Sequence, residues 1–577
     1  MPSFATLRPL VLALAATSIP PRASPARAAD PVRDLQDAYA AGKDEPADRA
    51  YHFGSQGRGG VFSNHTGHSN RLIPAYAFGR RVDLGAVLGP ASRYRDPARI
   101  QALYGTLPAH TANPDAAYAD QSDLHRVQRE AVARGVKYLF TVWFDGLDWE
   151  TTRAAAIAKT GRVYAEGKGA GLVFQEESAA GSAQFGFVVT SPTHDKNRVD
   201  LDAQTVTIPA ESLGGGYDAR IAGPDPWTLG PLGARAPGYL KGQAANADDK
   251  AGVAAVGGVL HACTDSSQSA GEYATGVKSY NNGVNVADDG RFVPTLFGAL
   301  QAQGWKVGTA TSVPFDHVSP AAMYAHNVHR DDYQDLARDM LGLRGIGQET
   351  GQDELHPGLD VVLGAGHGQE AGAEALRKSQ GRNAQAGNLY ITAADRAAVD
   401  VAHGGRYVVV GTAAGVRGAT AVQAAAERAA RDGHRLFGVF GTRTYGKTAS
   451  HLPYRTADGD YHPAAGVKEE AEVYAAADLE ENPTLADLTR AALTVLAAEP
   501  GRPFALFVEA GDVDFALHDN NLDNAIGAVH SGEAAVRAIL DWVETHSNWD
   551  ESALIVTADH GHYLVLDDPG ALAPKAP

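Results

Sequence analysis

Three side chains, Glu509, Asp514 and His518, have the types and spacing that metal binding needs. The residues before them, Phe504–Val508, are apolar without alternation and too few for a helix, so they predict a buried strand that stops at Glu509. Asp514 and His518 are four residues apart, which places them on one side of a helical turn. A carboxylate with a neutral imidazole suits zinc, and a carboxylate oxygen suits magnesium. The alternative for this segment alone is a solvated acidic turn with an unconnected histidine.

Ser266 is a candidate nucleophile. It follows Asp265 and precedes residues 270–275, which predict the first turn of a helix. A hydroxyl at a helix N-terminus lies beside free N–H groups and the positive end of the dipole, where a phosphoryl group is favoured. The alternative is that Ser266 and its neighbours Ser267 and Ser269 only cap the helix.

Arg330 is a candidate phosphate ligand. Ser319 precedes Pro320, which indicates the start of a helix, and Arg330 lies on or just past that helix. A guanidinium group matches two oxygens of a phosphate in geometry. The alternative is a solvated charge on the helix surface.

The elements that must position these groups alternate between strands and helices. Strand-like runs occupy residues 72–78, 138–144, 305–312, 359–366, 406–411 and 434–441, and a final run ends at Asp559. This alternation predicts an α/β protein with a largely parallel sheet. In such sheets ligands gather beyond the carboxyl ends of the strands. Because Asp145, Glu509 and Asp559 each follow a strand, we expect these three carboxylates at one edge of the sheet.

The composition excludes several classes of protein. Of the 577 residues 44% are hydrophobic, which is close to the globular norm, and the net charge of -18 argues against a general nucleic-acid binder. A single cysteine, Cys263, allows no intrachain disulfide. We see no apolar stretch long enough to cross a bilayer.

The N-terminal residues 1–29 predict a secretory signal. They contain Arg8, an apolar run over residues 9–19 and the small-residue pattern Ala26-Arg27-Ala28. We therefore expect a periplasmic or secreted protein. Residues 30–577 are interpreted as one catalytic domain, in which the Gly-, Pro- and Ala-rich residues 165–249 form an insertion.

Taken together, the segments TDSSQSAGEYATGVKSYNNG, VEAGDVDFALH and VTADH resemble the motifs of the alkaline phosphatase family. The resemblance covers about residues 138–160 and 253–567. It implies a three-layer sandwich with a mostly parallel central sheet and helices on both faces. It also implies an exported phosphomonoesterase that works through a phosphoserine and binds two zinc ions and one magnesium ion.

The resemblance also assigns roles to individual residues. Ser266 falls on the nucleophile, Arg330 on the phosphate-binding arginine, and Asp265 on the carboxylate that steadies this arginine. The metal ligands that it implies are Asp514 and His518 for the first zinc, Asp145, Asp559 and His560 for the second zinc, and Asp145, Glu509 and Ser319 for magnesium.

One ligand is missing from the place where the family has it. The family supplies a third histidine to the first zinc, in a His-Thr-Gly context downstream of the aspartate and histidine, but this sequence has only 17 residues after His560. His65-Thr66-Gly67 stands instead near the N-terminus, before a strand-like run. We therefore predict a circular permutation that moves this segment, about residues 50–100, to the front, with His65 as the ligand. The alternatives are that His68 or His562 completes the site, or that the site is incomplete.

The expected partners are small-molecule phosphate monoesters, and we allow for a homodimer. Two other functions compete with this one. The first is a phosphodiesterase or sulfatase-like hydrolase on the same metal scaffold, and the second is a non-catalytic phosphate-binding relative. Arg330 together with the third-metal ligands Glu509 and Ser319 favours monoesters, because these groups would stabilise the additional negative charge that a monoester carries on its nonbridging oxygens.

Overall fold

The computed structural model describes most of the chain. The described residues are 31–33, 68–195, 197–219, 223, 225–227, 261–442, 450–463, 471–519, 521–562, 564, 566 and 569–574. The signal segment 1–29 and His65 lie outside these residues. The expected export and the role of His65 therefore stay predictions, as does the homodimer.

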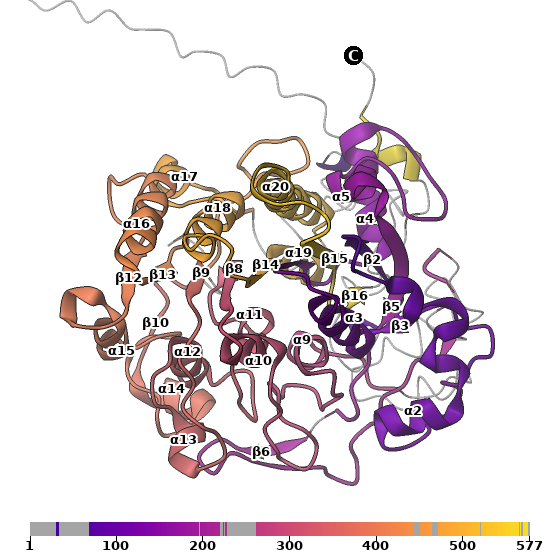
Figure 1. The fold of residues 1–577 in the computed structure, drawn as a ribbon, viewed down its shortest axis with the longest axis horizontal. Coiled ribbons are helices and arrows are strands. Elements are labelled where there is room, and N and C mark those ends of the chain that lie inside the picture. Colours follow the sequence, from indigo (N-terminus) through magenta and orange to yellow (C-terminus); the bar gives the residue numbers. More distant parts are fainter. Residues whose placement is uncertain are drawn as a thin grey trace, which may run out of the picture.

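Within the described residues, ten strands form a central sheet (Figure 1), in the order β12-β13-β9-β8-β14-β4-β15-β2-β5-β3. Neighbouring strands are parallel except at β2, which pairs antiparallel with both β15 and β5. The expected α/β fold with a mostly parallel sheet is confirmed. In sheet order the strands are Tyr407–Gly411, Arg435–Val439, Val361–Ala365, Lys306–Pro314, Phe504–Ala510, Tyr138–Phe144, Ser552–Thr557, Ile73–Phe78, Gln184–Val189 and Ala119–Asp120.

The middle of the sheet lies inside the hydrophobic core. The strands β8, β14, β4 and β15 are buried along almost their whole length. The apolar residues of β14, β4 and β15 do not alternate with polar ones, because a parallel strand covered on both faces has no solvated side. This explains why the runs at residues 138–144 and 504–508 were recognisable in the sequence.

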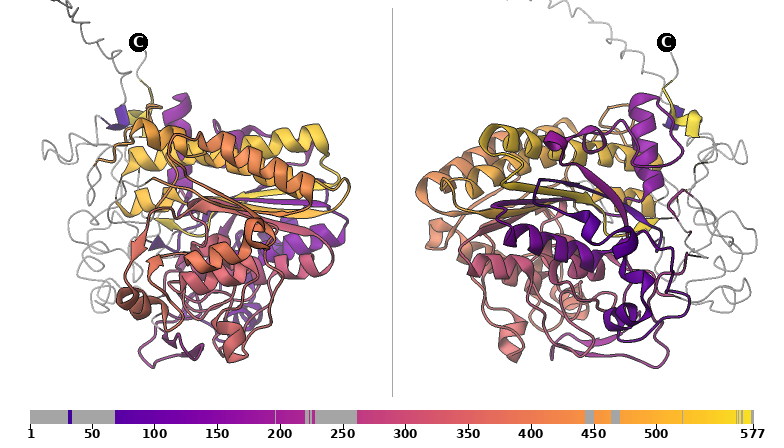
Figure 2. Two further views of the ribbon diagram at one scale, coloured as in Figure 1. Left: turned by 90° about the vertical axis from the view of Figure 1, so that its left-hand side faces the viewer. Right: turned by 45° about the vertical axis from the view of Figure 1, so that its right-hand side comes forward.

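Helices cover both faces of the sheet, which gives three layers (Figure 2). On one face lie α4 (Trp149–Thr160), α16 (Gly418–Asp432), α18 (Leu485–Leu496) and α20 (Leu522–His546). The other face carries α3 (Gln121–Ala133), α9 (Ser266–Thr275), α10 (Leu296–Ala302), α11 (Val318–Ala322) and α12 (Tyr333–Leu341). Shorter elements are α2 (Pro97–Tyr104), α5 (Val173–Glu176), α13 (Ile346–Thr350), α14 (Ala373–Gln380), α15 (Ala393–Val399), α17 (Ala476–Glu481), α19 (Asp512–His518) and the hairpins β6–β7 (Arg198–Asp200, Thr205–Thr207) and β10–β11 (Glu370–Ala371, Gly387–Asn388).

The two ends of the described chain meet in space. The strand β2 pairs antiparallel with β15. The short strand β1 (His68–Ser69) pairs with β16 (Gly561–His562), so that His68 lies opposite His562. This pairing brings an N-terminal histidine to the C-terminal motif. The permuted order of segments itself stays a prediction.

One expectation about the insertion needs adjustment. The sequence predicts that residues 165–249 form an insertion over the scaffold, but β5 (Gln184–Val189) from this range joins the central sheet beside β2. The glycine in its sequence QFGFVV obscured the strand signal. Most of residues 220–249 lie outside the described part of the chain.

Among the described helices, none combines the length and the apolar composition that crossing a bilayer requires.

Candidate active site

The three predicted carboxylates meet at one edge of the sheet. The strands β4, β14 and β15 are adjacent and parallel. Asp145 directly follows β4, Glu509 is the penultimate residue of β14, and Asp559 lies two residues after β15. All three side chains are fully buried. The carboxyl ends of neighbouring parallel strands therefore create the site that the sequence predicts.

A first cluster contains one aspartate and three histidines, His68, Asp514, His518 and His562. Asp514 and His518 are four residues apart on α19, and Oδ2 of Asp514 lies 3.4 Å from Nε2 of His518. Nε2 of His562 lies 2.8 Å from Oδ1 of Asp514. Nε2 of His68 lies 3.0 Å from Nε2 of His518 and 3.5 Å from Oδ1 of Asp514. The cluster thus assembles residues from both ends of the chain.

The hydrogen bonds of His68 determine which way its lone pair points. Nδ1 of His68 lies 2.8 Å from the carbonyl oxygen of Thr264, which accepts only, so Nδ1 carries the proton. Burial lowers the pKa of His68 to about 4, so the ring is neutral and Nε2 presents a lone pair. This lone pair faces Asp514 and His518. A carbonyl that orients a histidine in this way is the usual support of a metal ligand.

A second cluster surrounds Ser266. Asp145, Asp514 and His560 have ligand atoms close enough to share an ion. Oγ of Ser266 lies 3.4 Å from Oδ1 of Asp145 and 3.3 Å from Nε2 of His560. Asp559 completes the group, because its Oδ2 lies 3.3 Å from Nε2 of His560. The backbone N–H groups of Gly146 and His560 donate to Oδ1 of Asp559 and hold it in place.

The third group consists of Asp145, His317 and Glu509. Burial raises the pKa of Glu509 to about 8, although the hydroxyls of Thr311 and Ser319 lower it. Ser319 thus lies beside Glu509, as the sequence predicts. His317, two residues before the predicted ligand Ser319, belongs to this group, and Thr311 is an addition for which the sequence offers no local signal. Thr311 reaches Glu509 because the register of β8 and β14 places the two residues side by side.

These acidic groups fit divalent cations on physical grounds. Burial and the neighbouring carboxylates Asp559 and Asp514 raise the pKa of Asp145 well above its ordinary value. Burial likewise raises the pKa of Asp559 to about 6. Buried carboxylates in contact with one another destabilise the charged state unless a cation lies between them. The imidazole and carboxylate donors of the first two clusters suit zinc, and the oxygen-rich third group suits a harder ion such as magnesium.

Ser266 is the first residue of α9, and Asp265 is the N-cap. The helix thus begins four residues earlier than expected, because Oδ1 of Asp265 accepts from the N–H of Gln268 and closes the first turn. Nη1 of Arg330 lies 2.9 Å from Oδ2 of Asp265, so Asp265 both caps the helix and holds the arginine. Arg330 lies in the turn between α11 and α12. A phosphoryl group at Ser266 would therefore meet a helix N-terminus and a guanidinium.

Residues 244–571, more than half of the chain, match the family model described as alkaline phosphatase. The chain belongs to the alkaline phosphatase family. The matched range holds Ser266, Arg330, Asp514 and His560, whereas His68 and Asp145 precede it.

The chain is also similar to individual alkaline phosphatases. The protein from Escherichia coli K12 is 27% identical over 322 residues, which cover 54% of this chain and 60% of that protein. Alkaline phosphatase H from Pseudomonas aeruginosa is 29% identical over 328 residues, with the same coverage of 54% and 60%. The crystal structure of Thermus thermophilus alkaline phosphatase has a TM-score of 0.40 at 20% identity, and covers 74% of this chain and 60% of its own. The matches to the two curated relatives thus span about 60% of their length.

Most of the predicted site residues come together in this alkaline phosphatase family member. The structure gathers Asp145, Asp265, Ser266, Ser319, Arg330, Glu509, Asp514, His518, Asp559 and His560. The predicted ligand His65 lies outside the described residues. The two alternatives that the sequence left open, His68 and His562, both reach the first cluster.

Lys278, at the end of the serine motif, is buried between two carboxylates and stabilises the fold rather than the site. Its ammonium group lies 3.0 Å from Oδ2 of Asp120 and 2.8 Å from Oε1 of Glu272, and it donates to the carbonyl of Ser191. All three charged side chains are fully buried. Burial alone would raise the pKa of Asp120, but the charges of Lys278 and Arg93 lower it to about 2. The network connects the end of α9 to the start of α3.

Replacing Lys278 with methionine is expected to destabilise the protein by about 3–5 kcal/mol, because two buried carboxylates would lose their cation. Chemical denaturation followed by circular dichroism measures this loss. The matched control is Lys137→Met, which breaks an exposed ion pair with Glu551 and should change stability little. An unchanged denaturation midpoint in Lys278→Met would show that the network does not stabilise the fold.

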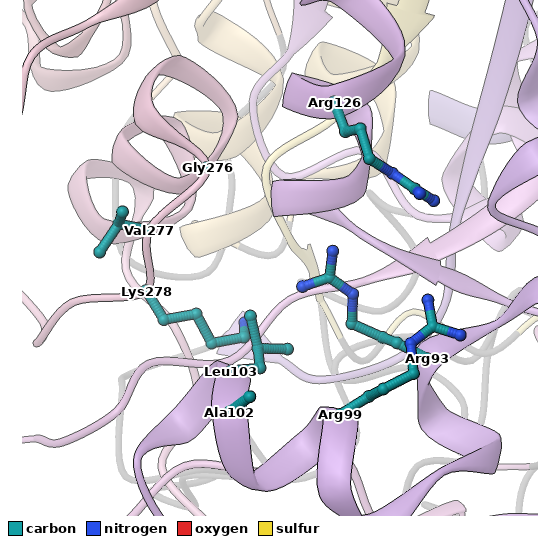
Figure 3. A pocket seen from close by; sticks show the side chains of 8 residues that line it. All are labelled: Arg93, Arg99, Ala102, Leu103, Arg126, Gly276, Val277 and Lys278. Atoms are coloured by element: carbon teal, nitrogen blue, oxygen red, sulfur yellow. The ribbon is translucent and has the colours of Figure 1, made fainter.

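A cavity of about 370 Å³ lies beside the C-terminal end of α9, whereas Ser266 begins this helix. Figure 3 shows the side chains that line the cavity. Three arginine side chains extend into this region in Figure 3, and two of them, Arg93 and Arg126, form ion pairs with Asp123. The lining residues are Arg93, Arg99, Ala102, Leu103, Arg126, Gly276, Val277 and Lys278. No predicted catalytic or metal residue lines it, so we treat it as separate from the active site.

Proposed function

We propose that the protein is a metal-dependent phosphomonoesterase that uses Ser266 as its nucleophile. The observation that carries this proposal is the position of the Ser266 hydroxyl, at the start of α9 and within 3.4 Å of both Asp145 and His560. The Asp265–Arg330 pair lies beside it. This is an arrangement for phosphoryl transfer, in which positioning and electrostatics contribute most of the rate.

The reaction divides into two displacements at phosphorus. In the first, Oγ of Ser266 forms a bond to phosphorus and its hydroxyl proton passes to solvent, while the ester P–O bond breaks and the leaving alkoxide takes a proton from solvent to become the alcohol. In the second, water attacks the phosphoserine and releases inorganic phosphate and the free hydroxyl. Arg330 holds two phosphoryl oxygens through both steps, and Asp265 fixes its orientation.

The residues present would hold two zinc ions and one magnesium ion. Asp514, His518 and His68 would bind the first zinc, and the second would use Asp145, Asp559 and His560. Asp145, Glu509 and Ser319 would bind magnesium, with His317 beside them. When bound, these cations supply positive charge that stabilises the phosphoryl oxygens and lowers the pKa of a neighbouring hydroxyl.

We further propose that His68, rather than His65, is the N-terminal ligand of the first zinc. The tautomer of His68 supports this proposal. The hydrogen bond from Nδ1 to the carbonyl of Thr264 directs the lone pair of Nε2 at His518 and Asp514. His562 lies within 2.8 Å of Asp514 and would orient this carboxylate. An N-terminal segment that supplies a ligand to the C-terminal motif is what the permutation predicts.

The specificity for monoesters separates this proposal from its alternatives. We expect the metal-loaded protein to hydrolyse 4-nitrophenyl phosphate at least about tenfold faster than bis(4-nitrophenyl) phosphate, a difference of about 1.4 kcal/mol in the barrier. The reason is that Arg330 and the buried cation sites match the additional negative charge of a monoester. Chelation should abolish the activity, and added zinc and magnesium should restore it.

Two outcomes of the same assay would contradict the proposed function. A faster reaction with the diester would favour the phosphodiesterase alternative. If the protein binds metal yet hydrolyses neither ester, the non-catalytic alternative would hold. Elemental analysis of the same sample shows whether metal is bound.

A further inference from the structure

A second group of metal-type side chains lies apart from the active site. His326 stands between α11 and α12, Asp339 is part of α12, and Asp353 and His356 lie between α13 and β9. The helices α11, α12 and α13 lie on one side of the sheet in Figure 1. The ligand atoms of His326, Asp353 and His356 lie close enough to share one metal ion, and Asp339 adjoins them.

The ring of His326 is oriented as a metal ligand would be. Its Nε2 lies 2.9 Å from the carbonyl oxygen of Val293, so Nε2 carries a proton and donates it. Phe292 stacks on the ring, with the ring centroids 5.6 Å apart. Nδ1 therefore points away from these contacts, toward Asp339 and Asp353. A histidine whose second nitrogen donates to a backbone carbonyl is held in the tautomer that metal binding needs.

Hydrogen bonds satisfy only part of this group, since Nε2 of His356 donates to Oδ1 of Asp353 and the backbone N–H of His326 donates to Oδ2 of Asp339. Nδ1 of His326 lies 3.1 Å from Oδ2 of Asp353, yet neither atom has a hydrogen-bond partner among the described residues. Nδ1 also lies 3.6 Å from Oδ2 of Asp339. The side chains of His326 and Asp339 are only 4% and 6% exposed. A cation between Nδ1 of His326 and the two carboxylates would satisfy these buried atoms.

Three donor separations in the group are close to those around a tetrahedral ion, and Asp353 faces the two imidazoles with different carboxylate oxygens. Ligand bonds of about 2.0–2.1 Å place tetrahedral donor atoms about 3.3 Å apart. The separations here are 3.1 Å and 3.6 Å for His326 with the two aspartates, and 3.2 Å between Nε2 of His356 and Oδ1 of Asp353. His356 is 30% exposed, so it leaves an entry path from solvent.

We propose that His326, Asp339, Asp353 and His356 form an additional zinc site, distinct from the catalytic clusters and structural in role. Two imidazoles and two carboxylates suit zinc better than calcium or magnesium, which prefer oxygen ligands alone. Two negative charges would balance one divalent cation. The ion would tie the segment before Arg330 to α12 and to the loop that leads into β9.

The competing state without metal is a protonated His326 between two carboxylates. Burial lowers the pKa of His326, but Asp339 and Asp353 outweigh burial and raise it to about 10. The proton and the zinc ion would occupy the same place. Counting zinc distinguishes the two states directly.

The test is the zinc content of the full-length protein and its variants after dialysis against dilute zinc, measured by mass spectrometry of the elements. We expect His356→Ala and Asp353→Asn each to bind one zinc ion per chain fewer than the unaltered protein. The matched control is His434→Ala, which removes an exposed histidine outside the group and should keep the full count. Thermal unfolding should show that added zinc stabilises the unaltered protein more than His356→Ala.

A folding check and a second variant control for misfolding of His356→Ala. Because His356 is partly exposed, His356→Ala should fold, and circular dichroism checks this. His356→Gln provides a second variant that keeps a polar side chain. An unchanged zinc count in both folded His356 variants would overturn the site and leave the protonated His326 as the native state.

Discussion

Replacing Ser266 with alanine is expected to lower kcat for a phosphate monoester by at least about 10³-fold while the zinc content stays unchanged, which corresponds to about 4 kcal/mol in the barrier. The hydroxyl oxygen forms the bond to phosphorus in the proposed reaction, and a methyl group has no lone pair to do so. The metal donors Asp145 and His560 remain in place. Steady-state kinetics and elemental analysis of the same preparation measure both quantities.

A neighbouring serine provides the control. Ser269→Ala removes a hydroxyl on the same helix, whose contacts at 3.2 Å are the backbone carbonyls of Asp265 and Ser266. This variant should keep nearly full activity, because the helix retains its own hydrogen bonds. Acid quenching with a labelled substrate should trap phosphate on the unaltered protein and not on Ser266→Ala. Near-normal turnover in Ser266→Ala would refute its role as the nucleophile.

Replacing His68 with alanine is expected to remove one zinc ion per chain and to lower kcat/KM at least about 10²-fold. Loss of a residue that merely orients a ligand costs about 10–100-fold in metal affinity, and loss of a direct ligand should cost no less. The remaining donors Asp514 and His518 would keep one imidazole and one carboxylate. Zinc stoichiometry by elemental analysis is the primary measurement.

The matched variant is His65→Ala, three residues earlier in the same segment. We expect it to keep both the zinc content and the activity, because the geometry of His68 already supplies the imidazole. The reverse result, zinc loss in His65→Ala with full zinc in His68→Ala, would restore His65 as the ligand. Loss of zinc in neither variant would leave the first cluster without an N-terminal ligand.

The contribution of the sequence is clearest where chemistry and local pattern coincide. The runs at residues 138–144 and 504–508 predicted β4 and β14, because continuous apolar stretches of this length occur in strands buried on both faces. The spacing of Asp514 and His518 predicted one side of a helical turn, and both residues lie on α19. Such features depend on residues close together in the chain.

Other parts of the site depended on contacts that no local pattern contains. Thr311 meets Glu509 through the register of two strands that are almost 200 residues apart in the sequence. The additional group at His326, Asp353 and His356 likewise gathers separate segments. In β5, a glycine within the strand weakened its signal, and only the pairing with β2 placed it in the sheet.

By itself the sequence determined the α/β class, the carboxylates at the strand ends and the serine, arginine and histidine motifs of the alkaline phosphatase family. Only the tertiary structure decided which histidines reach the first cluster, because β1 pairs with β16 and thereby sets His68 beside Asp514, His518 and His562. The physical reason is that ligand type and helical spacing are local properties, whereas the direction of an imidazole lone pair depends on a distant carbonyl, here that of Thr264.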